Sequence, residues 1–247
     1  ALPLLAWVVV LVLPLPAMAA AGLLLVALVP SGATSNMFSY LVQGDLALSV
    51  SLTALSGFLA PFVLPLVMGW NFELLGLAAQ GFSLPYWQTV GQLLLVTVLP
   101  ALIGMLLRYW LPDAAIAQLL PFVKRLTGLA MLFVVVGLFV VYQHRLPALL
   151  SLETLAVLAL CILAMLLGYR TARGLRFPTD SVRAITVEVG VQNAGIAMMV
   201  AFAILQLPQL GLVPLLYGIL MNVPVFAWVA FCLWRDRQPA AIRVGSE

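Results

Sequence analysis

Charged side chains are scarce in this chain, and their scarcity excludes an ordinary soluble domain. Asp, Glu, Lys and Arg make up 8% of the 247 residues, whereas 65% of the residues are hydrophobic and the mean hydropathy is +1.19. Soluble domains carry about 25% charged residues. Apolar stretches of about 20 residues recur along the chain, and each can cross a hydrocarbon core of roughly 30 Å. We therefore predict an all-α polytopic membrane protein embedded in the lipid bilayer.

Cysteine and histidine are also rare. Cys161 and Cys232 stand alone in apolar segments, where packing is expected rather than a disulfide or a metal site. The only histidine, His144, lies beside Arg145 in a loop. The sequence has no metal-ligand cluster, no phosphate-binding glycine loop and no Ser/His pair at membrane depth. These absences argue against an enzyme, and the lack of interleaved basic and aromatic residues argues against a nucleic-acid partner.

Proline, glycine and charged residues divide the chain into eight candidate membrane spans, with no soluble domain between them. The expected spans cover residues 2–16, 19–43, 46–69, 84–109, 119–142, 147–170, 180–206 and 210–234. The first span also resembles a secretory signal, because Ala17-Met18-Ala19 has the small residues of a cleavage site. A basic segment before it is absent, so we interpret it as a spanning helix whose beginning is missing.

Basic residues are divided unequally between the two sides that eight spans imply. Ten of the 11 Lys and Arg residues fall on the side of the C-terminus, and Arg145 alone falls on the other. Cytoplasmic loops carry the excess of Lys and Arg, so the C-terminus is predicted to be cytoplasmic. The net charge of +3 then reflects topology and contact with anionic lipid. We expect an integral protein of a bacterial inner membrane.

Two of the spans carry a polar interruption near their middle. The second contains Pro30-Ser31-Gly32-Ala33-Thr34-Ser35-Asn36, where Pro30 lacks an N–H and frees nearby carbonyls from helical hydrogen bonds. The seventh contains Glu188-Val189-Gly190-Val191-Gln192-Asn193, with Glu188 roughly 12 Å into the span at 1.5 Å per residue. An ionisable residue at this depth needs a partner, and Ser35-Asn36 is the best candidate.

Interrupted helices in the two halves of a membrane protein indicate the binding site of a secondary transporter. Unwound carbonyls and a carboxylate suit a hard cation such as sodium, while half-helix N-termini suit an anionic substrate. The pattern therefore predicts cation-coupled transport. The structural alternative is that such side chains only cap helices or bond between them. We favour that alternative for Ser51 and Gln92, but not for Glu188 with Gln192 and Asn193.

Three motifs together carry a resemblance to a known family. They are Ser35-Asn36, Gly44-Asp45-Leu46-Ala47-Leu48-Ser49-Val50-Ser51-Leu52-Thr53 and Glu188-Val189-Gly190-Val191-Gln192-Asn193-Ala194-Gly195. In these motifs the chain resembles the bile acid:sodium symporter family. The resemblance implies an inverted-repeat transporter with two broken, crossing helices, and sodium-coupled symport of organic anions by alternating access. It implies no cofactor besides Na+ as coupling ion, and carboxylates that are bile-acid-like, keto acids or pantoate-like as substrates.

The resemblance also implies roles for individual residues. One sodium site would use the side chains of Ser35, Asn36, Ser49, Thr53 and Glu188. A second sodium site would share Glu188 and add the carbonyls of Val189 and Val191 and the side chain of Gln192. Thr34 and Asn193, where the broken helices would cross, are the candidates for contact with the anionic group of the substrate.

The chain departs from the family pattern in two places. The family begins with two helices that have no counterpart before Ala1, and a glutamine that completes its second sodium site falls in that region. Ser31-Gly32-Ala33-Thr34 stands where relatives often have Gly-Gly-Thr-Ala, which changes the side chain facing a bound anion. We therefore expect residues 1–247 to form one transporter domain, the remnant of a ten-helix fold. Its core helices would be about 1–43 and 147–206, and its panel helices about 46–142 and 210–234.

Two other functions remain as alternatives. A metalloid exporter of the same fold, such as an arsenite-type exporter, needs a reactive thiol in a broken helix. Cys161 and Cys232 are far from both polar segments in sequence, so we expect neither to lie near them. A non-transport membrane subunit would have no need for a carboxylate at mid-membrane, and no Gly-x-x-x-Gly pair indicates a dimerising helix.

Overall fold

The regular elements of the described residues are helices. The computed structural model describes residues 1–142 and 151–237, so His144, Arg145 and Arg243 lie outside the described residues. The longer helices are α4 (Leu46–Leu74), α5 (Tyr86–Trp110), α6 (Asp113–Tyr142), α7 (Leu152–Gly174) and α11 (Asn222–Arg237). The shorter elements are α1 (Leu2–Val12), α2 (Ala17–Val26), α3 (Ala33–Leu41), η1 (Ala78–Gln80), α8 (Thr179–Gly190), α9 (Ala194–Met199), the π-helical η3 (Val200–Ile204), η4 (Pro208–Gly211) and α10 (Leu212–Leu220).

Four of the described helical segments are long and apolar enough to cross a membrane. They are Leu46–Leu74, Tyr86–Trp110, Leu152–Gly174 and Pro208–Arg237. The predicted all-α polytopic membrane fold is confirmed, although the boundaries differ. The first span ends at Val12 rather than at residue 16, because Pro14 and Pro16 disfavour helix in the residues before them.

The two predicted broken helices are present. The second span is divided into α2 and α3, and the seventh into α8 and α9. The first break covers residues 27–32, earlier than the polar segment suggested, so Ser35 and Asn36 lie in the first turns of α3 rather than in unwound chain. The cause is Pro30, which cannot donate a backbone hydrogen bond and therefore interrupts the helix ahead of these polar residues.

The two unwound segments cross each other and satisfy one another's backbone groups. The Gly32 N–H donates to the Val191 carbonyl at 3.1 Å, and the Asn193 N–H donates to the Pro30 carbonyl at 2.9 Å. These bonds form an isolated antiparallel bridge between Ser31 and Gln192. Backbone polar groups that lipid cannot satisfy must find partners within the protein, and here each break supplies them for the other.

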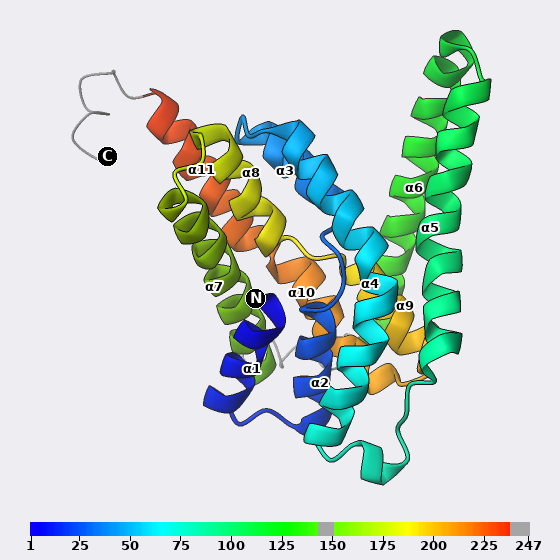
Figure 1. The fold of residues 1–247 in the computed structure, drawn as a ribbon, viewed down its shortest axis with the longest axis vertical. Helices are drawn as coiled ribbons and strands as arrows, with labels where there is room; N and C mark the ends of the chain where they lie inside the picture. Colours follow the sequence, from blue (N-terminus) through cyan, green and yellow to red (C-terminus); the bar gives the residue numbers. More distant parts are fainter. Residues whose placement is uncertain (143–150, 238–247) are drawn as a thin grey trace.

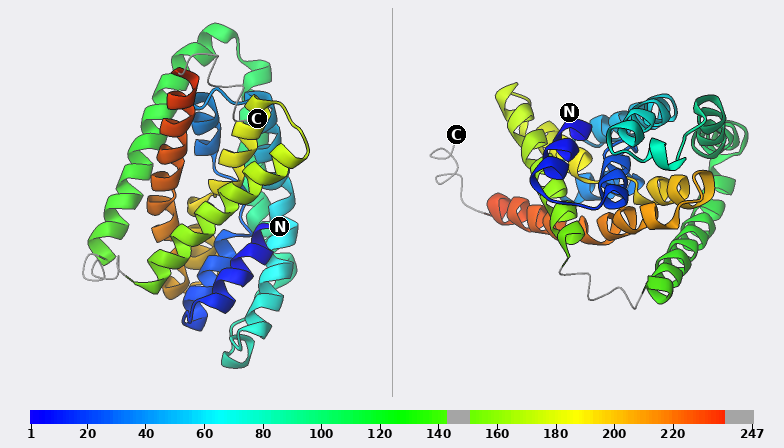
Figure 2. Two further views of the ribbon diagram at one scale, coloured as in Figure 1. Left: turned by 90° about the vertical axis from the view of Figure 1, so that its left-hand side faces the viewer. Right: turned by 90° about the horizontal axis from the view of Figure 1, so that it is seen from below.

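The helices form a bundle with the crossing near its middle and α5 and α6 along one edge, away from α7 and α11 (Figures 1 and 2). Helix α4 packs against α2, α3 and α8, while α10 packs against α2, α7 and α9. Both helices therefore contact elements predicted to belong to the core, whereas α5 packs against α4. The core and panel division stays a prediction, and this packing favours placing α4 and α10 with the core.

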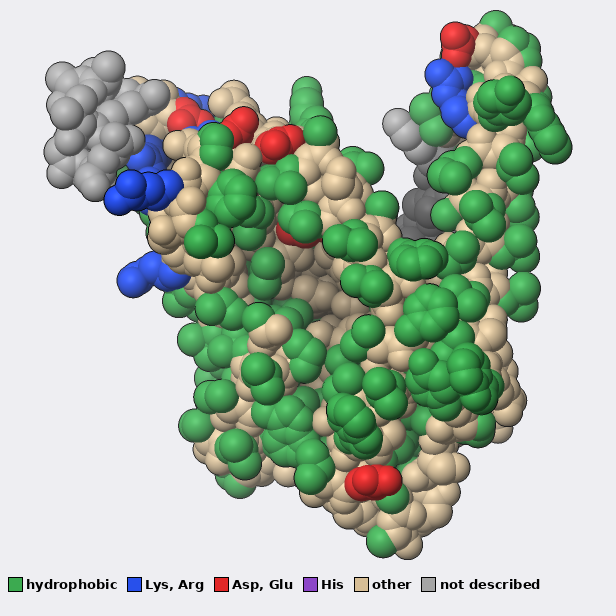
Figure 3. Space-filling model, in the orientation of Figure 1, with side chains coloured by type: hydrophobic (Ala, Val, Ile, Leu, Met, Phe, Trp, Pro, Cys, Tyr) green, Lys and Arg blue, Asp and Glu red, His purple; other side chains and the backbone are tan. Residues whose placement is uncertain are grey.

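The outer surface is rich in large apolar side chains (Figure 3). On α5, for example, Leu95, Met105 and Trp110 are all exposed. Exposed apolar area on this scale marks a surface that contacts membrane or protein. Together with the apolar helices, it identifies the chain as an integral membrane protein.

Candidate functional site

The Glu188 carboxylate near the end of α8 is the centre of a buried hydrogen-bond network. Its Oε1 accepts hydrogen bonds from the Ser31 hydroxyl and from Thr53 Oγ1, the latter at 2.5 Å. Its Oε2 accepts from Ser49 Oγ at 2.9 Å. The side chain is 5% exposed. The first break, α4 and α8 thus converge on one carboxylate that is removed from solvent.

Helix α4 presents two of these hydroxyls because Ser49 and Thr53 are four residues apart and share a face. The helix begins at a fixed position, since the Asp45 carboxylate accepts a hydrogen bond from the Leu48 N–H at 3.0 Å. Asp45 is tied to α8 in turn, because its N–H donates to the Asp180 carbonyl at 3.1 Å. Local capping therefore sets which hydroxyls face Glu188.

Ser49 is shared by more acceptors than its single proton can satisfy. Its Oγ lies 2.9 Å from Glu188 Oε2, 2.9 Å from Asn36 Oδ1 and 3.0 Å from Ser39 Oγ. A hydroxyl has one O–H to donate, so either the carboxylate or the Asn36 carbonyl keeps a lone pair free. The cluster has an excess of oxygen acceptors over donors, and a cation would balance it.

Ser35, which directly precedes Asn36, carries a buried and unsatisfied hydroxyl. Its side chain is fully buried, and its hydroxyl has no hydrogen-bond partner among the described residues. A buried unsatisfied polar group costs about 1–3 kcal/mol. Such a group in a native protein calls for an explanation, for which a bound ion is one physical candidate.

Four of the five residues predicted for the first sodium site, namely Asn36, Ser49, Thr53 and Glu188, join one network. Ser35-Asn36 is not the direct partner of Glu188, because Asn36 connects to it through Ser49. The prediction missed Ser31 and Ser39, although the sequence held a signal for both. Ser31 directly follows Pro30, and Ser39 comes one helical turn after Ser35.

The residues predicted for the second sodium site lie together but are already engaged within the protein. The Gln192 side-chain amide donates to the Val189 carbonyl at 2.8 Å. The Val191 carbonyl accepts the Gly32 N–H that holds the crossing together. Each of these carbonyl oxygens retains a second lone pair. The second site therefore stays a prediction that the geometry accommodates.

The two predicted substrate-contacting residues are placed differently. Asn193 caps α9, because its side-chain oxygen accepts from the Ile196 N–H at 3.1 Å. Its amide hydrogens remain for another acceptor, and the residue lines a cavity of about 640 Å³. Thr34 is exposed and is not among the residues lining that cavity, where Ala33 appears instead.

Two cavities meet at the helix crossing and share Pro30 and Ser31. The larger, of about 640 Å³, lies between the crossing, α4 and α5. The other, of about 520 Å³, is lined by Glu188, Val189 and Gln192 together with residues from α1, the first break and α4. The crossing therefore separates a space beside α5 from a space beside the Glu188 network.

The expectation that neither cysteine lies near the polar segments is wrong for Cys161. Its thiol donates to the Gly190 carbonyl at 3.5 Å, and Tyr217 donates its phenolic O–H to the same carbonyl at 3.0 Å. The cause is tertiary packing of α7 and α10 against the end of α8, where the helix break frees a carbonyl. Cys161 is fully buried and lines neither of the two cavities at the crossing.

Crossed broken helices around a buried carboxylate define a polytopic α-helical membrane protein built like a secondary transporter. The profile of the Sodium Bile acid symporter family matches residues 2–149, and the chain belongs to this family.

The chain is similar along most of its length to several curated proteins. It is 31% identical to the Probable sodium/metabolite cotransporter BASS1, chloroplastic, of Oryza sativa subsp. japonica, over 81% of this chain and 48% of that protein. It is 29% identical to Sodium/bile acid cotransporter 4 of Homo sapiens, over 90% and 51%. It is 31% identical to the Uncharacterized sodium-dependent transporter YocS of Bacillus subtilis (strain 168), over 82% and 61%. The chain thus spans about half the length of the curated relatives it matches.

Proposed function

We propose that this chain supplies the ion and substrate sites of a sodium-coupled symporter of organic anions. The observation that carries the proposal is the Glu188 network, in which a buried carboxylate and the Asn36 carbonyl share the Ser49 hydroxyl. The nearby residue Ser35 adds a buried hydroxyl with no partner among the described residues. The names of the relatives, which include sodium-dependent cotransporters, support the same function.

Sodium suits the chemistry of the cluster. Hard cations prefer carboxylate, carbonyl and hydroxyl oxygens, which are the groups gathered here. The donor set carries a single negative charge, on Glu188, which one monovalent cation neutralises. We therefore assign the first sodium site to Ser35, Asn36, Ser49, Thr53 and Glu188, with Ser31 as an additional residue holding the carboxylate. The second site, with Val189, Val191 and Gln192, remains part of the proposal.

The larger cavity suits an organic anion with a sizeable apolar body. Its volume of about 640 Å³ is in the range of small-molecule sites, roughly 300–1,000 Å³. Among the described residues the lining is mostly aliphatic, with Ser31, Thr53, Thr97 and Asn193 as polar groups and with no Lys, Arg or His. The starts of α3 and α9 border it, so helix N-termini rather than ion pairs would hold a single anionic group. This favours bile-acid-like monocarboxylates over short keto acids, which would leave most of the cavity unfilled.

Coupling would follow from the shared position of the two sites at the crossing. Sodium bound to Glu188 would fix α3, α4 and α8 relative to one another, and so fix the two N-termini that receive the anion. Each ligand would then raise the affinity for the other, as thermodynamic linkage requires. Movement of the α5 side relative to the crossing would expose the cavity alternately, with the arginine-rich end of the molecule cytoplasmic.

The test is the sodium dependence of stability in the purified full-length protein. Thermal unfolding should be measured in NaCl and in KCl of equal ionic strength. A sodium concentration of 100 times Kd stabilises the folded state by about 2.7 kcal/mol. We expect a sodium-specific rise in Tm that Glu188→Gln abolishes, together with loss of sodium-driven uptake.

Glu73→Gln is the matched control, because Glu73 is an exposed carboxylate in the last turn of α4 and should leave the sodium response unchanged. An undiminished sodium response in Glu188→Gln would contradict the site. If sodium did not raise the Tm of the wild type, sodium coupling itself would be contradicted.

A further inference from the structure

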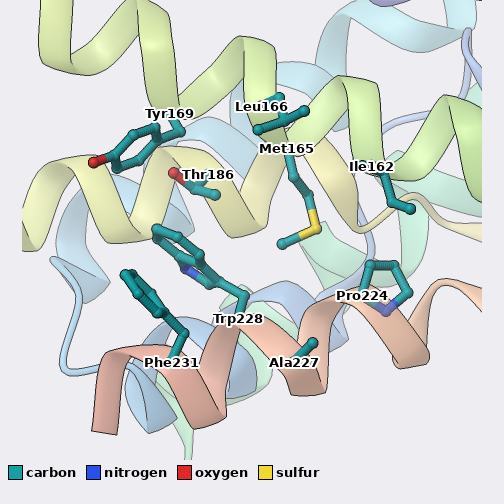
Figure 4. Close-up of a pocket in the computed structure, with 9 residues that line it drawn as sticks. All are labelled: Ile162, Met165, Leu166, Tyr169, Thr186, Pro224, Ala227, Trp228 and Phe231. Carbon is teal, nitrogen blue, oxygen red and sulfur yellow. The ribbon is translucent and has the colours of Figure 1, made fainter. Parts of the chain in front are cut away.

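A separate groove lies on the far side of the molecule from α5 and α6. It has a volume of about 380 Å³ and is formed by one face of α7, one face of α11 and part of α8. We name it the α7/α11 groove. Figure 4 shows the α7 side chains facing those of α11, with Tyr169 and Phe231 at one end of the groove and Ile162 and Pro224 at the other. The lining is almost entirely apolar; its residues are Ile162, Met165, Leu166, Tyr169, Thr186, Pro224, Ala227, Trp228 and Phe231.

On each helix that lines the groove, an arginine follows the last lining residue by one helical turn. On α7 the lining residues follow helical spacing up to Tyr169, and Arg173 comes four residues later on the same face. On α11 the lining runs from Pro224 to Phe231, and Arg235 again comes four residues later. Both helices end at the same side of the molecule, because Arg183 at the start of α8 bonds Asp236 near the end of α11. The apolar groove therefore leads towards two guanidinium groups.

These two arginines are half-buried and lack an acidic partner. Neither Arg173 nor Arg235 forms an ion pair within residues 1–142 and 151–237. The nearest acidic side chain in sequence, Asp236, is held by Arg183 at 2.5 and 2.9 Å. The Arg173 guanidinium lies 6.0 Å from the centre of the Tyr169 ring, which places its charge at the end of the groove. Two partly desolvated positive charges without carboxylates favour an anionic ligand.

The aromatic side chains of α11 indicate where the groove lies relative to the membrane. Trp228 stacks on Phe231 with ring centres 5.5 Å apart, and Phe231 is followed by Trp234 at 6.3 Å. Aromatic rows of this kind lie at the level of the lipid headgroups. The Trp228 indole N–H is buried and has no hydrogen-bond partner in the described part of the chain. Trp228 lies about 10 Å, or seven helical residues, before Arg235 along α11.

We propose that the α7/α11 groove binds one anionic phospholipid. The phosphate would lie between Arg173 and Arg235. An acyl chain would fill the apolar groove, past Trp228, towards Ile162 and Pro224. Charge complementarity selects this occupant: a zwitterionic lipid would bring a cationic group to the arginines, and a free anion would leave the apolar part of the groove unfilled. Basic pockets between membrane helices are known to hold acidic lipid headgroups.

The test compares lipids on the purified full-length protein. Thermal unfolding and lipid retention by native mass spectrometry should be measured with phosphatidylglycerol, with phosphatidylcholine and with inorganic phosphate. We expect phosphatidylglycerol alone to raise Tm by several degrees and to remain bound as a single molecule. Arg173→Gln with Arg235→Gln should weaken its retention by roughly fivefold for each arginine removed, and Trp228→Phe should weaken it without changing the preference for an anionic headgroup.

Arg170→Gln with Arg176→Gln is the matched control, because both arginines are exposed at the same end of α7 and lie off the groove. Equal losses in the control and in the groove variant would overturn the proposal, since general surface charge would then explain the binding. Equal retention of phosphatidylcholine, or a shift with phosphate alone, would also overturn it. If Arg173→Gln with Arg235→Gln fails to fold, the Trp228→Phe measurement still decides whether the lipid lies in the groove.

Discussion

Ser35 carries a buried hydroxyl that a bound ligand would satisfy. It is fully buried in the first turn of α3, and its hydroxyl finds no partner in the described chain. Its neighbour Asn36 shares the Ser49 hydroxyl with Glu188. A polar network is usually satisfied throughout when it is buried, because each orphan group is costly in a low dielectric. The proposed sodium ion would satisfy the Ser35 hydroxyl and the oxygens that share the Ser49 proton.

Ser35→Ala should therefore separate folding from ion binding. Without sodium the variant should be as stable as the wild type or more stable, because the change removes a buried unsatisfied hydroxyl worth about 1–3 kcal/mol. Its sodium affinity, measured from the sodium dependence of Tm, should fall about tenfold, since the lost ligand contacts a charge.

Thr89 provides the matched control for this substitution. Its hydroxyl is also buried and has no partner among the residues that the structure describes, but it lies in α5 outside the Glu188 network. Thr89→Val should leave sodium affinity unchanged. If Ser35→Ala kept wild-type sodium affinity, Ser35 would be an orphaned hydroxyl of structural origin and not an ion ligand.

At the scale of elements, α2, the first half of the first broken helix, packs closely against η4 and α10. Gly22 in α2 is an example, because a Cβ placed on it would lie 2.9 Å from the Leu210 carbonyl oxygen and 3.0 Å from Val213 Cβ. Neither atom belongs to the flexible end of a side chain. Small residues permit this approach between membrane helices, where packing rather than water drives association.

Gly22→Ala should consequently force α2 away from η4 and α10. Overpacking of this kind costs about 1–3 kcal/mol, and for a protein of this size 1 kcal/mol lowers Tm by roughly 2–4 °C. Thermal unfolding in detergent measures the change. Gly91→Ala is the control, because a Cβ on Gly91 of α5 meets nothing within 4 Å and should not lower Tm. Equal Tm values for wild type and Gly22→Ala would contradict the close packing.

At the scale of the whole molecule, the crossing joins the ion cluster to the larger cavity. Ser31 contacts Glu188 and lines both cavities, and Asn193 bonds the first break through its backbone while facing the larger cavity. The crossing of the two broken helices therefore contributes residues to both proposed sites. This arrangement has a thermodynamic consequence that does not depend on the identity of the substrate.

Sodium and substrate should strengthen each other's binding by the same factor. Binding of a graded series of monocarboxylates, from keto acids to bile-acid-like steroids, should be measured with and without sodium, and sodium binding with and without the best ligand. We expect equal factors of roughly 5 to 150, with the larger anions giving the larger factor. Substrate binding that is indifferent to sodium would contradict coupling through the crossing.

The membrane class, the two broken helices and four of the residues that gather around Glu188 could be predicted from the sequence. Composition and span length decide the class, because lipid tolerates only helices with satisfied backbones or closed barrels. Pro30 and the run from Glu188 to Asn193 indicate the breaks, since such residues have no use in a continuous apolar helix. The contacts of Ser31 and Cys161 could not be predicted in this way, because they depend on which helices meet at each break.

Sequence by itself therefore determined which residues are polar in an apolar chain and where its helices are interrupted. Tertiary structure alone decided that Ser31 rather than Ser35 holds the Glu188 carboxylate, that Cys161 and Tyr217 satisfy the freed Gly190 carbonyl, and that one face of α7 lies opposite α11 across a groove. The physical reason is that helical periodicity fixes the face on which a side chain lies. The partner of that face depends on how distant segments pack.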